Sequence, residues 1–282
     1  MRQKDPAFAQ LLNRLRTRKR SEPLETSDIN MLMKQETGED DANFIHIFAT
    51  NAQVDEFNVT ALHSKCTDPI SIQAQDFSRN LKTRKLEKRE NPHVKVHNSV
   101  LPKNLFVAIG ARVMITKNID TSDGLVNGVF GTISNISLTD GEAFPSRIYV
   151  VFDNDKIGHK LRNLKGTASA LQTNSTPIAP LEETVSNNGG IRRQFPLKLA
   201  WACTIHKVQG ITVDKAVVSL GKIFAAGQAY VALSRVSSLG GLIIENFKES
   251  VIYSSEKVEA AVSCMPKFMT ANQRLNDAHA TL

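Results

Sequence analysis

The chain has 282 residues, and its hydrophobic content of 41% is enough for one large domain or for two smaller ones with cores of their own. Its 35 Lys and Arg residues outnumber its 28 Asp and Glu residues, and the net charge of +7 suits a polyanionic partner without proving one. The three cysteines show neither disulfide nor zinc-site spacing, and no apolar run reaches the roughly 20 residues that span a membrane. These features argue against a metal site and a membrane partner, and they predict a soluble protein of a reducing compartment, the nucleus or the cytosol.

Two helices are predicted at the start of the chain. Apolar residues at helical spacing predict the first helix over residues 6–18, where a basic cluster ends it. Ser27 or Asp28 then opens the second helix. The acidic run at residues 39–41 follows a polar stretch rather than a strand, so we interpret it as a solvated loop.

A strand and a third helix come next. Residues 44–48 alternate as a strand does, and Thr50 or Asn51 is well placed to cap a helix over residues 53–64. A strand, a cap and a helix in this order form one βα unit of an open sheet. A purely structural role as helix cap is therefore one interpretation of Thr50 and Asn51.

The middle of the chain has a different character. Residues 79–97 are charged and poor in apolar groups, which predicts a surface excursion. Between residues 105 and 151, short β-rich runs are separated by turn residues such as Asn127-Gly128, which predicts a small β-barrel insert. Residues 164–190 are rich in Ser, Thr, Asn and Gly, and this composition predicts a mobile loop.

Two segments near the C-terminus carry the chemistry. Residues 204–212 (TIHKVQGIT) place a hydroxyl, an imidazole, an ammonium, an amide and a glycine in a polar turn between apolar runs, where α/β proteins bind ligands. Residues 227–235 (GQAYVALSR) predict an amphipathic helix with Arg235 turned away from the face of Tyr230. An arginine held on a rigid helix suits recognition of a phosphate bound to another domain.

These segments resemble the last two signature motifs of the superfamily-one DNA helicases, in particular the PIF-type (petite-integration-frequency) branch. Residues 2–16 and 48–58 resemble earlier motifs of the same family, and residues 110–131 resemble its insert. The resemblance implies an α/β fold: a RecA-like parallel-sheet lobe of the P-loop NTPase type, lacking the P-loop half, with an inserted small SH3-like β-barrel. It also implies four segments. These are the first part of the second RecA-like lobe (1–100), the barrel insert with its mobile loop (101–190), the remainder of the lobe (191–250) and a C-terminal tail (251–282).

The resemblance also assigns roles to single residues. Arg235 and Arg2 would be catalytic, with Arg235 as an arginine finger and Arg2 as a second arginine at the γ-phosphate. Gln209, Gly210 and Arg235 would face the nucleotide. The residues that would bind the backbone of single-stranded DNA are Thr50, Asn51, Thr204, His206 and Lys207.

For some of these residues the sequence leaves a purely structural alternative open. His206 could be a core histidine bonded to a backbone carbonyl, and Tyr230 could be an ordinary core aromatic rather than a residue that stacks on a base. Val208 stands where the family often has serine, so one polar contact to the strand is missing here.

The chain contains no G-x-x-x-x-G-K-[ST] loop, because its only Gly-Lys pair, Gly221-Lys222, is followed by Ile223. The resemblance therefore predicts the C-terminal motor lobe of an ATP-dependent 5′–3′ DNA helicase. This lobe would bind single-stranded DNA and donate an arginine finger to ATP and magnesium held mainly by a first RecA-like lobe, in cis or in trans. Alone it would hydrolyse no ATP.

Two other functions remain open at this point. One is a single-stranded nucleic-acid-binding module without ATPase activity, and the other is a protein-interaction scaffold. The family further implies DNA repair, recombination or telomere maintenance, and a mitochondrial location is compatible with it.

Overall fold

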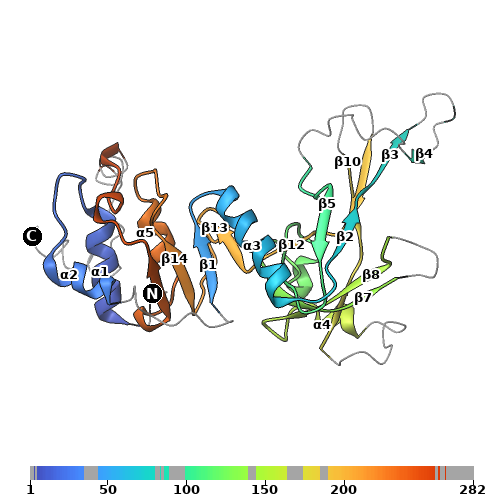
Figure 1. Ribbon diagram of the computed structural model, residues 1–282, viewed down its shortest axis with the longest axis horizontal. Coiled ribbons are helices and arrows are strands. Elements are labelled where there is room, and N and C mark those ends of the chain that lie inside the picture. The colour runs from blue at the N-terminus through green and yellow to red at the C-terminus, as the bar shows by residue number, and fades with distance from the viewer. Residues whose placement is uncertain are drawn as a thin grey trace, which may run out of the picture.

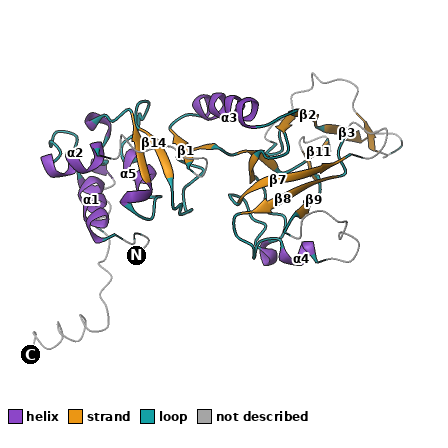
Figure 2. Ribbon diagram, turned by 60° about the horizontal axis from the view of Figure 1, so that its bottom comes forward, coloured by secondary structure: helices purple, strands orange, loops and turns teal. Residues whose placement is uncertain are grey.

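The computed structural model describes residues 3, 5–34, 44–79, 83, 86–88, 99–138, 144–163, 174–184, 190–257, 260 and 264. These residues form two parts that lie side by side along the long axis of the molecule (Figure 1). One part holds a parallel sheet with helices, and the other is built mainly of antiparallel strands (Figure 2). Within the described residues, no helix is both long enough and apolar enough to cross a membrane.

The first part is built on a four-stranded sheet in which all neighbouring strands are parallel. In spatial order its strands are β13 (Ala202–Thr204), β1 (Ile45–Phe48), β14 (Ala216–Ser219) and β15 (Leu242–Glu245). The strands consist mostly of apolar residues because helices cover the sheet, as is usual for parallel sheets.

Alternate strand residues pack against different helices. Ile47 and Cys203 share a core with helices α1 (Pro6–Thr17) and α5 (Gln228–Leu233). Phe48 and Ala202 instead pack with Val54 of helix α3 (Asn51–Lys65). Helices therefore cover both faces of the sheet at β1 and β13.

The predicted helices are present, but the second begins differently from the expectation. Helix α1 starts at Pro6, and the Asp5 carboxylate caps it by accepting hydrogen bonds from the N–H groups of Ala7 and Phe8. Helix α2 (Thr26–Met33) begins after Glu25, with no side-chain cap. The expected cap at Ser27 or Asp28 is therefore wrong.

The Asp28 carboxylate has a different partner. It is buried and accepts two hydrogen bonds from the guanidinium of Arg14, with N–O distances of 2.6 and 2.8 Å. This interaction raises the pKa of Arg14 above its ordinary value. The ion pair joins α1 to α2. Because the Asp28 carboxylate is bound to Arg14, it does not cap the N-terminus of α2.

The second part contains three sheets. They have the orders β12-β6-β7-β8-β9, β10-β11-β3-β4 and β2-β5. The strands that precede residue 101 are β2 (Ile70–Gln73), β3 (Gln75–Arg79) and β4 (Leu86–Lys88). The strands that follow are β5 (Asn104–Val107), β6 (Arg112–Ile115), β7 (Phe130–Ser137), β8 (Arg147–Phe152), β9 (Thr176–Ile178), β10 (Leu181–Thr184), β11 (Ile191–Gln194) and β12 (Leu197–Leu199). Four further short helices lie among the described residues, namely α4 (His159–Arg162), η1 (Thr121–Asp123), η2 (Leu239–Gly241) and η3 (Glu249–Val251).

The strand pairing extends the insert beyond the range expected from sequence. Strands β2 to β4 precede residue 101, and β11 and β12 follow residue 190, yet all of them pair with strands of this part. The expected boundaries at residues 101 and 190 therefore fall inside the antiparallel sheets. These strands carry many polar residues, and their pairing partners are distant in sequence, so local pattern did not indicate them.

The loop predicted over residues 164–190 is wrong for residues 176–184, which form β9 and β10. Pro177 fits in β9 because this strand lies at the edge of its sheet, where a missing N–H donor is tolerated. Residues 164–173 and 185–189 lie outside the described residues, as do the acidic run at 39–41 and most of the excursion at 79–97.

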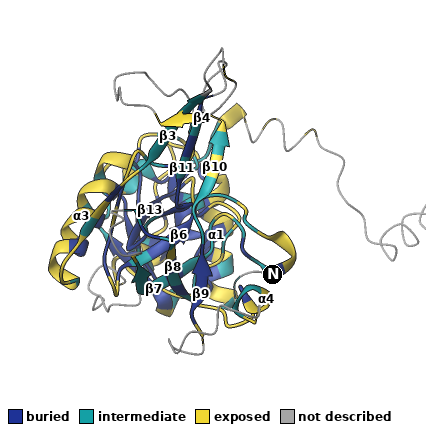
Figure 3. Cartoon of the chain, turned by 90° about the vertical axis from the view of Figure 1, so that its right-hand side faces the viewer, coloured by how far each residue is buried: buried dark blue, intermediate teal, exposed yellow. Residues whose placement is uncertain are grey.

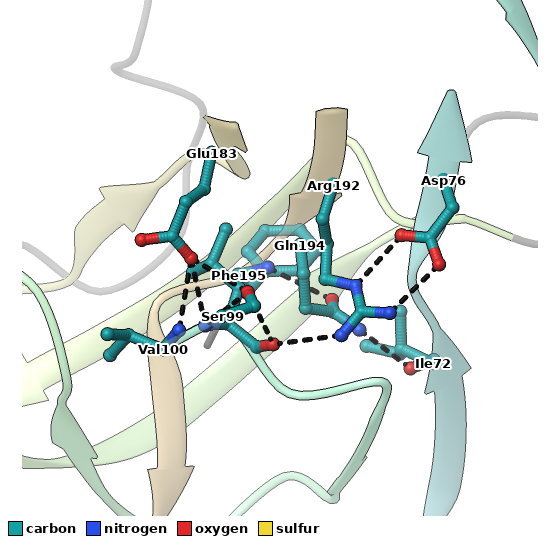
Figure 4. A network of polar contacts seen from close by, with 9 residues as sticks. Ile72, Asp76, Ser99, Val100, Glu183, Arg192, Gln194 and Phe195 are labelled. Atoms are coloured by element: carbon teal, nitrogen blue, oxygen red, sulfur yellow. Dashed lines mark hydrogen bonds and ion pairs between the residues drawn. The ribbon is translucent and has the colours of Figure 1, made fainter. Parts of the chain in front are cut away.

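A polar network joins strands of the second part (Figure 4). Arg192 on β11 donates to both carboxylate oxygens of Asp76 on β3, at 2.8 and 2.9 Å. Glu183 on β10 accepts from the Ser99 hydroxyl at 2.7 Å and from the Val100 N–H at 3.0 Å. Burial opposes ionisation of Glu183, but hydrogen bonds from Ser99 and Lys117 outweigh it and hold the pKa of this carboxyl below its ordinary value.

Buried residues fill the interior of both parts, while the outer face of α3 is exposed (Figure 3). Helix α3 connects the parts, because Val54 packs with the parallel sheet and Ala61 and Leu62 belong to the core of the antiparallel part. A second contact lies at Gly128, where an added Cβ atom would be 3.0 Å from Cδ1 of Ile211. Gly128 also has a φ of +95°, so both space and backbone conformation favour glycine there.

Candidate functional site

The carboxyl ends of β1 and β13 lie at the same edge of the parallel sheet. Phe48 pairs with Thr204, and the Ile205 N–H donates to the Phe48 carbonyl at 3.0 Å. The segments that follow the two strands therefore start next to one another. Together with Thr204, the last residue of β13, they carry all five residues expected to bind a nucleic-acid strand, the others being Thr50, Asn51, His206 and Lys207.

Thr50 is the N-cap of α3, as expected from sequence. Its hydroxyl oxygen accepts a hydrogen bond from the Gln53 N–H at 3.4 Å. The same hydroxyl donates to the side-chain Oε1 of Gln53 at 3.0 Å. Asn51 is the first helical residue and its side chain is exposed. Thr50 thus has a structural role whether or not it binds a ligand, whereas Asn51 presents its amide to solvent.

Residues 204–211 form a compact turn. The N–H groups of Lys207 and Val208 both donate to the Thr204 carbonyl, at 2.9 and 3.3 Å. Ile205 and Val208 are buried, and they anchor the turn to the core. The turn is therefore rigid on its inner side and polar on its outer side.

The outer side carries His206, Lys207, Gln209 and Gly210, all of which are exposed. The alternative that His206 is a core histidine is therefore wrong. Thr204, by contrast, is only 7% exposed, which leaves its hydroxyl little accessible surface. Gly210 has a φ of +90° and no atom within 4 Å of an added Cβ, so backbone conformation rather than packing favours glycine there.

Asn58 of α3 holds β13 in place. It is buried, its Nδ2 donates to the Ala202 carbonyl at 3.0 Å, and its Oδ1 accepts from the Ala202 N–H at 2.9 Å. Since β13 is an edge strand, these main-chain groups have no further strand to pair with. One amide side chain therefore completes the pairing of the strand that leads into the turn.

Arg235 follows α5 and is 9% exposed. Its Nε donates to the Val231 carbonyl one helical turn earlier, at 3.0 Å, and its own carbonyl accepts from the Val213 N–H at 2.9 Å. Gln3, at the start of the chain, donates from Nε2 to the Ser234 carbonyl at 3.0 Å. The first residues of the chain thus come within contact of the segment that holds Arg235, although Arg2 itself lies outside the described residues.

A cavity of about 840 Å³ opens beside these elements. It is lined by the end of α1, the turn at residues 205–209, residues 224–231 and residues 254–255. His206 and Gln209 contribute to the lining, whereas Gly210 and Arg235 do not. Gln209 and the N-terminal end of α5 therefore line one concave surface. Arg235 lies past the C-terminal end of α5 and is not part of that surface.

No group of three or more metal-ligating side chains occurs among the described residues. The magnesium ion expected from sequence therefore has no ligand cluster in this part of the chain. That expectation already assigned the metal mainly to another lobe.

Comparison with known proteins identifies the family. Residues 95–136 match the family described as "DNA helicase Pif1, 2B domain". The ATP-dependent DNA helicase PIF1 of Rattus norvegicus is 38% identical over 157 residues, which cover 55% of this chain and 21% of that protein. The protein of the same name from Emericella nidulans is 29% identical over 288 residues, covering 91% of this chain and 37% of the relative.

The solved structures agree with this. The crystal structure of Pif1 helicase from Candida albicans superposes with a TM-score of 0.71 and 27% identity, covering 93% of this chain and 59% of that one. The chain matches a region of the Pif1-family DNA helicases that includes the 2B domain. Pif1 helicase from Bacteroides, solved in complex with ADP-AlF3 and ssDNA, shares the fold with a TM-score of 0.65 and 24% identity, over 93% of this chain and 54% of that one.

The Pif1 match confirms the resemblance recognised in the sequence and places a 2B domain in the antiparallel part, since residues 95–136 include β5, β6 and most of β7. The chain spans only 21% to 37% of the length of these two curated relatives. It therefore corresponds to a region of a Pif1 helicase.

Two polar residues near the turn escaped the sequence interpretation. Lys198 on β12 interrupts an apolar run, and burial lowers its pKa, an effect that nearby Lys207 reinforces and that Cys203 and Asp55 oppose. A lysine within an apolar strand is a signal that could have been used. It places another cation close to Lys207.

The other residue is Gln228, at the start of α5. It is 5% exposed, and its Nε2 has no hydrogen-bond partner among the residues that the structure describes. No pattern in the neighbouring sequence marks Gln228 as a buried residue, because its burial depends on segments that are distant in the chain.

Proposed function

We propose that this chain acts as the second motor lobe of an ATP-dependent 5′–3′ DNA helicase, with its parallel sheet as a RecA-like lobe and its 2B domain as an SH3-like barrel insert. In this role it binds single-stranded DNA and donates Arg235 to ATP, which a first RecA-like lobe holds together with magnesium. The observation that supports the proposal most is the β1–β13 register, because it brings Asn51, His206 and Lys207 to one exposed edge.

This arrangement suits a sugar-phosphate backbone. A protonated or neutral imidazole, an ammonium and an amide can each donate to phosphate oxygens, and the N–H groups at the start of α3 point to the same edge. The Bacteroides relative, whose structure contains ssDNA and ADP-AlF3, supports both ligands for the fold.

The nucleotide role rests on Arg235. A guanidinium is always charged and can stabilise the charge that develops on a transferring phosphoryl group. The contact between Gln3 and Ser234 supports the companion role of Arg2, since it draws the start of the chain toward Arg235. Gln209 and Gly210, exposed on the turn, would face the same nucleotide.

Strand binding is tested by fluorescence anisotropy of a labelled oligo-dT at several salt concentrations. Each phosphate contact on a single strand contributes about 0.7 to the slope of log K against log salt. Changing both His206 and Lys207 to Ala should therefore lower the steepness of this slope by up to about 1.4.

A matched control comes from the other part, where His159 and Lys156 are likewise exposed. Changing both of them to Ala should leave the slope unaltered. An unchanged slope in the His206/Lys207 variant would remove these residues from phosphate contact.

The role of Arg235 is tested by joining this chain to the P-loop lobe of a Pif1 relative and measuring ATP turnover. Removal of an arginine finger lowers the rate by about 10³- to 10⁵-fold. Arg235→Ala should cause a loss of this size with strand affinity retained. Near-normal turnover would eliminate Arg235 from the mechanism.

A strand-binding module without ATPase activity is the second candidate. It is favoured by the low exposure of Arg235 and by the hydrogen bond from its Nε to its own helix, because the side chain must rearrange to reach a phosphate. Strand binding by the joined protein with no ATP turnover at all would support this candidate.

A further inference from the structure

The cavity beside α5 is lined by a combination of basic, aromatic and apolar side chains that suggests a ligand. Among its lining residues, Arg16 and His206 are the groups that can carry positive charge, and none carries a carboxylate. The remainder of the surface is largely apolar or aromatic and includes Phe224 and Tyr230. This composition suits a ligand that combines a flat apolar body with negative charge nearby.

Gln228 supplies a donor without an acceptor. Its Oε1 accepts from the N–H groups of Phe224 and Ala225, at 3.2 and 3.4 Å, and these bonds fix the orientation of the amide. The opposite atom, Nε2, is buried and has no partner among the described residues. Buried donors are nearly always satisfied in native proteins, so this N–H is open to an acceptor brought to the Gln228 side of the cavity.

Two aromatic rings border the same space. Phe224 is 69% exposed, which is unusual for a large apolar side chain in the first part of the molecule, and Tyr230 is half-buried. Every nucleobase has a flat face that can stack on such rings and acceptor atoms at its edge. A planar base would therefore use both the rings and the Gln228 amide.

The cavity adjoins the polar turn that carries two of the proposed strand-binding residues. His206 lines it, and the adjacent Lys207 lies on the exposed side of the same turn. We propose that the cavity receives a nucleobase of the bound single strand, stacked on Phe224 or Tyr230 with an acceptor atom facing Gln228 Nε2. This inference rests on the proposed strand binding and names where a base goes once the backbone is bound.

The test compares two oligonucleotides of equal length, oligo-dT and an abasic strand with the same backbone, by anisotropy at fixed salt. The readout is the ratio of the two affinities, since changes in charge affect both strands alike. Loss of one stacking or edge contact should reduce this ratio about tenfold. Phe224→Ala removes the exposed ring, and Gln228→Glu keeps the oxygen that binds the turn while removing the donor.

Phe106→Ala provides the control, because Phe106 is also exposed, at 48%, but lies on β5 of the 2B domain. It should leave the ratio unchanged. If the parent chain binds neither strand, the proposed function itself fails. If it binds both and neither the Phe224 nor the Gln228 variant alters the ratio, only the nucleobase inference is overturned.

A third measurement separates the strand from a free nucleotide. ATP added at millimolar concentration should leave the ratio of dT to abasic affinity unchanged in the parent chain. A ratio that falls to the value of the Phe224→Ala variant would assign the cavity to the nucleotide and overturn the assignment to the strand.

Discussion

Replacement of Asn58 by alanine tests how the edge strand β13, which leads into the polar turn, is held. The Asn58 amide makes two hydrogen bonds with the main chain of Ala202, at 3.0 and 2.9 Å, in a buried position. In Asn58→Ala the N–H and the carbonyl of Ala202 both lose their partner, and no strand in the described part of the chain lies outside β13 to replace it.

The magnitude follows from these two groups. A buried main-chain group left without a partner costs about 1–3 kcal/mol, so the pair costs about 2–6 kcal/mol. Alanine recovers about 0.5 kcal/mol through its higher helix propensity. The free energy of unfolding should therefore fall by about 2–5 kcal/mol, measured by urea denaturation followed by circular dichroism, and the Ala202 amide should exchange faster with solvent.

Asn13→Ala is the matched control, because Asn13 lies within α1 and is exposed. It records the change in helix propensity without the loss of a buried contact and should alter stability by less than about 0.5 kcal/mol. A loss below about 1 kcal/mol for Asn58→Ala, or unaltered exchange at Ala202, would refute the account of the edge strand given above.

Three further outcomes are expected. Gly241→Ala should destabilise the chain strongly, because the new Cβ would lie 1.9 Å from the Asp214 carbonyl oxygen, whereas Gly240→Ala, with no atom within 4 Å, should be nearly neutral in thermal unfolding. Cys203, fully buried and with its pKa raised to about 12 by burial, should resist iodoacetamide until denaturant is added. Burial lowers the pKa of Lys198 below its ordinary value of 10.5. Between the lowered pKa and 10.5 the unfolded chain therefore binds more protons at this lysine than the folded chain does. The contribution of Lys198 to the free energy of unfolding should consequently increase as the pH rises toward 10.5.

Each of these outcomes has a measurement that opposes it. Equal melting temperatures for the two glycine variants would contradict the close approach at Gly241. Rapid alkylation of Cys203 in the native chain, identified by mass spectrometry, would contradict its burial. For Lys198 the comparison is with Lys198→Met, and parallel pH profiles of the parent and the variant would show that its burial has no cost.

Local pattern predicted the elements whose signals are themselves local. The alternation of residues 44–48 and the hydroxyl of Thr50 were sufficient to predict β1 and the start of α3, because a strand and a cap depend on neighbouring residues. Strand β9 was missed since its Thr-Pro-Ile sequence resembles a turn. Only pairing with β8 makes it a strand, and that pairing is not local.

The candidate site divides in the same way. The polar turn was visible in the sequence, because buried Ile205 and Val208 alternate with exposed polar residues. The cavity was not visible, since the end of α1 and residues 254–255 come from opposite ends of the described chain. The unsatisfied Nε2 of Gln228 could not be predicted either, because this atom is buried only when those distant segments pack around it.

Helix α3 has a mechanical consequence. From Thr50 at the edge of the parallel sheet to Leu62 in the core of the antiparallel part, the helix rises about 18 Å at 1.5 Å per residue. A tilt of about 5° at one end of a rod of this length displaces the other end by about 2 Å. Because α3 packs against the parallel sheet at its start and within the core of the antiparallel part further along, a tilt of this helix would shift one part relative to the other.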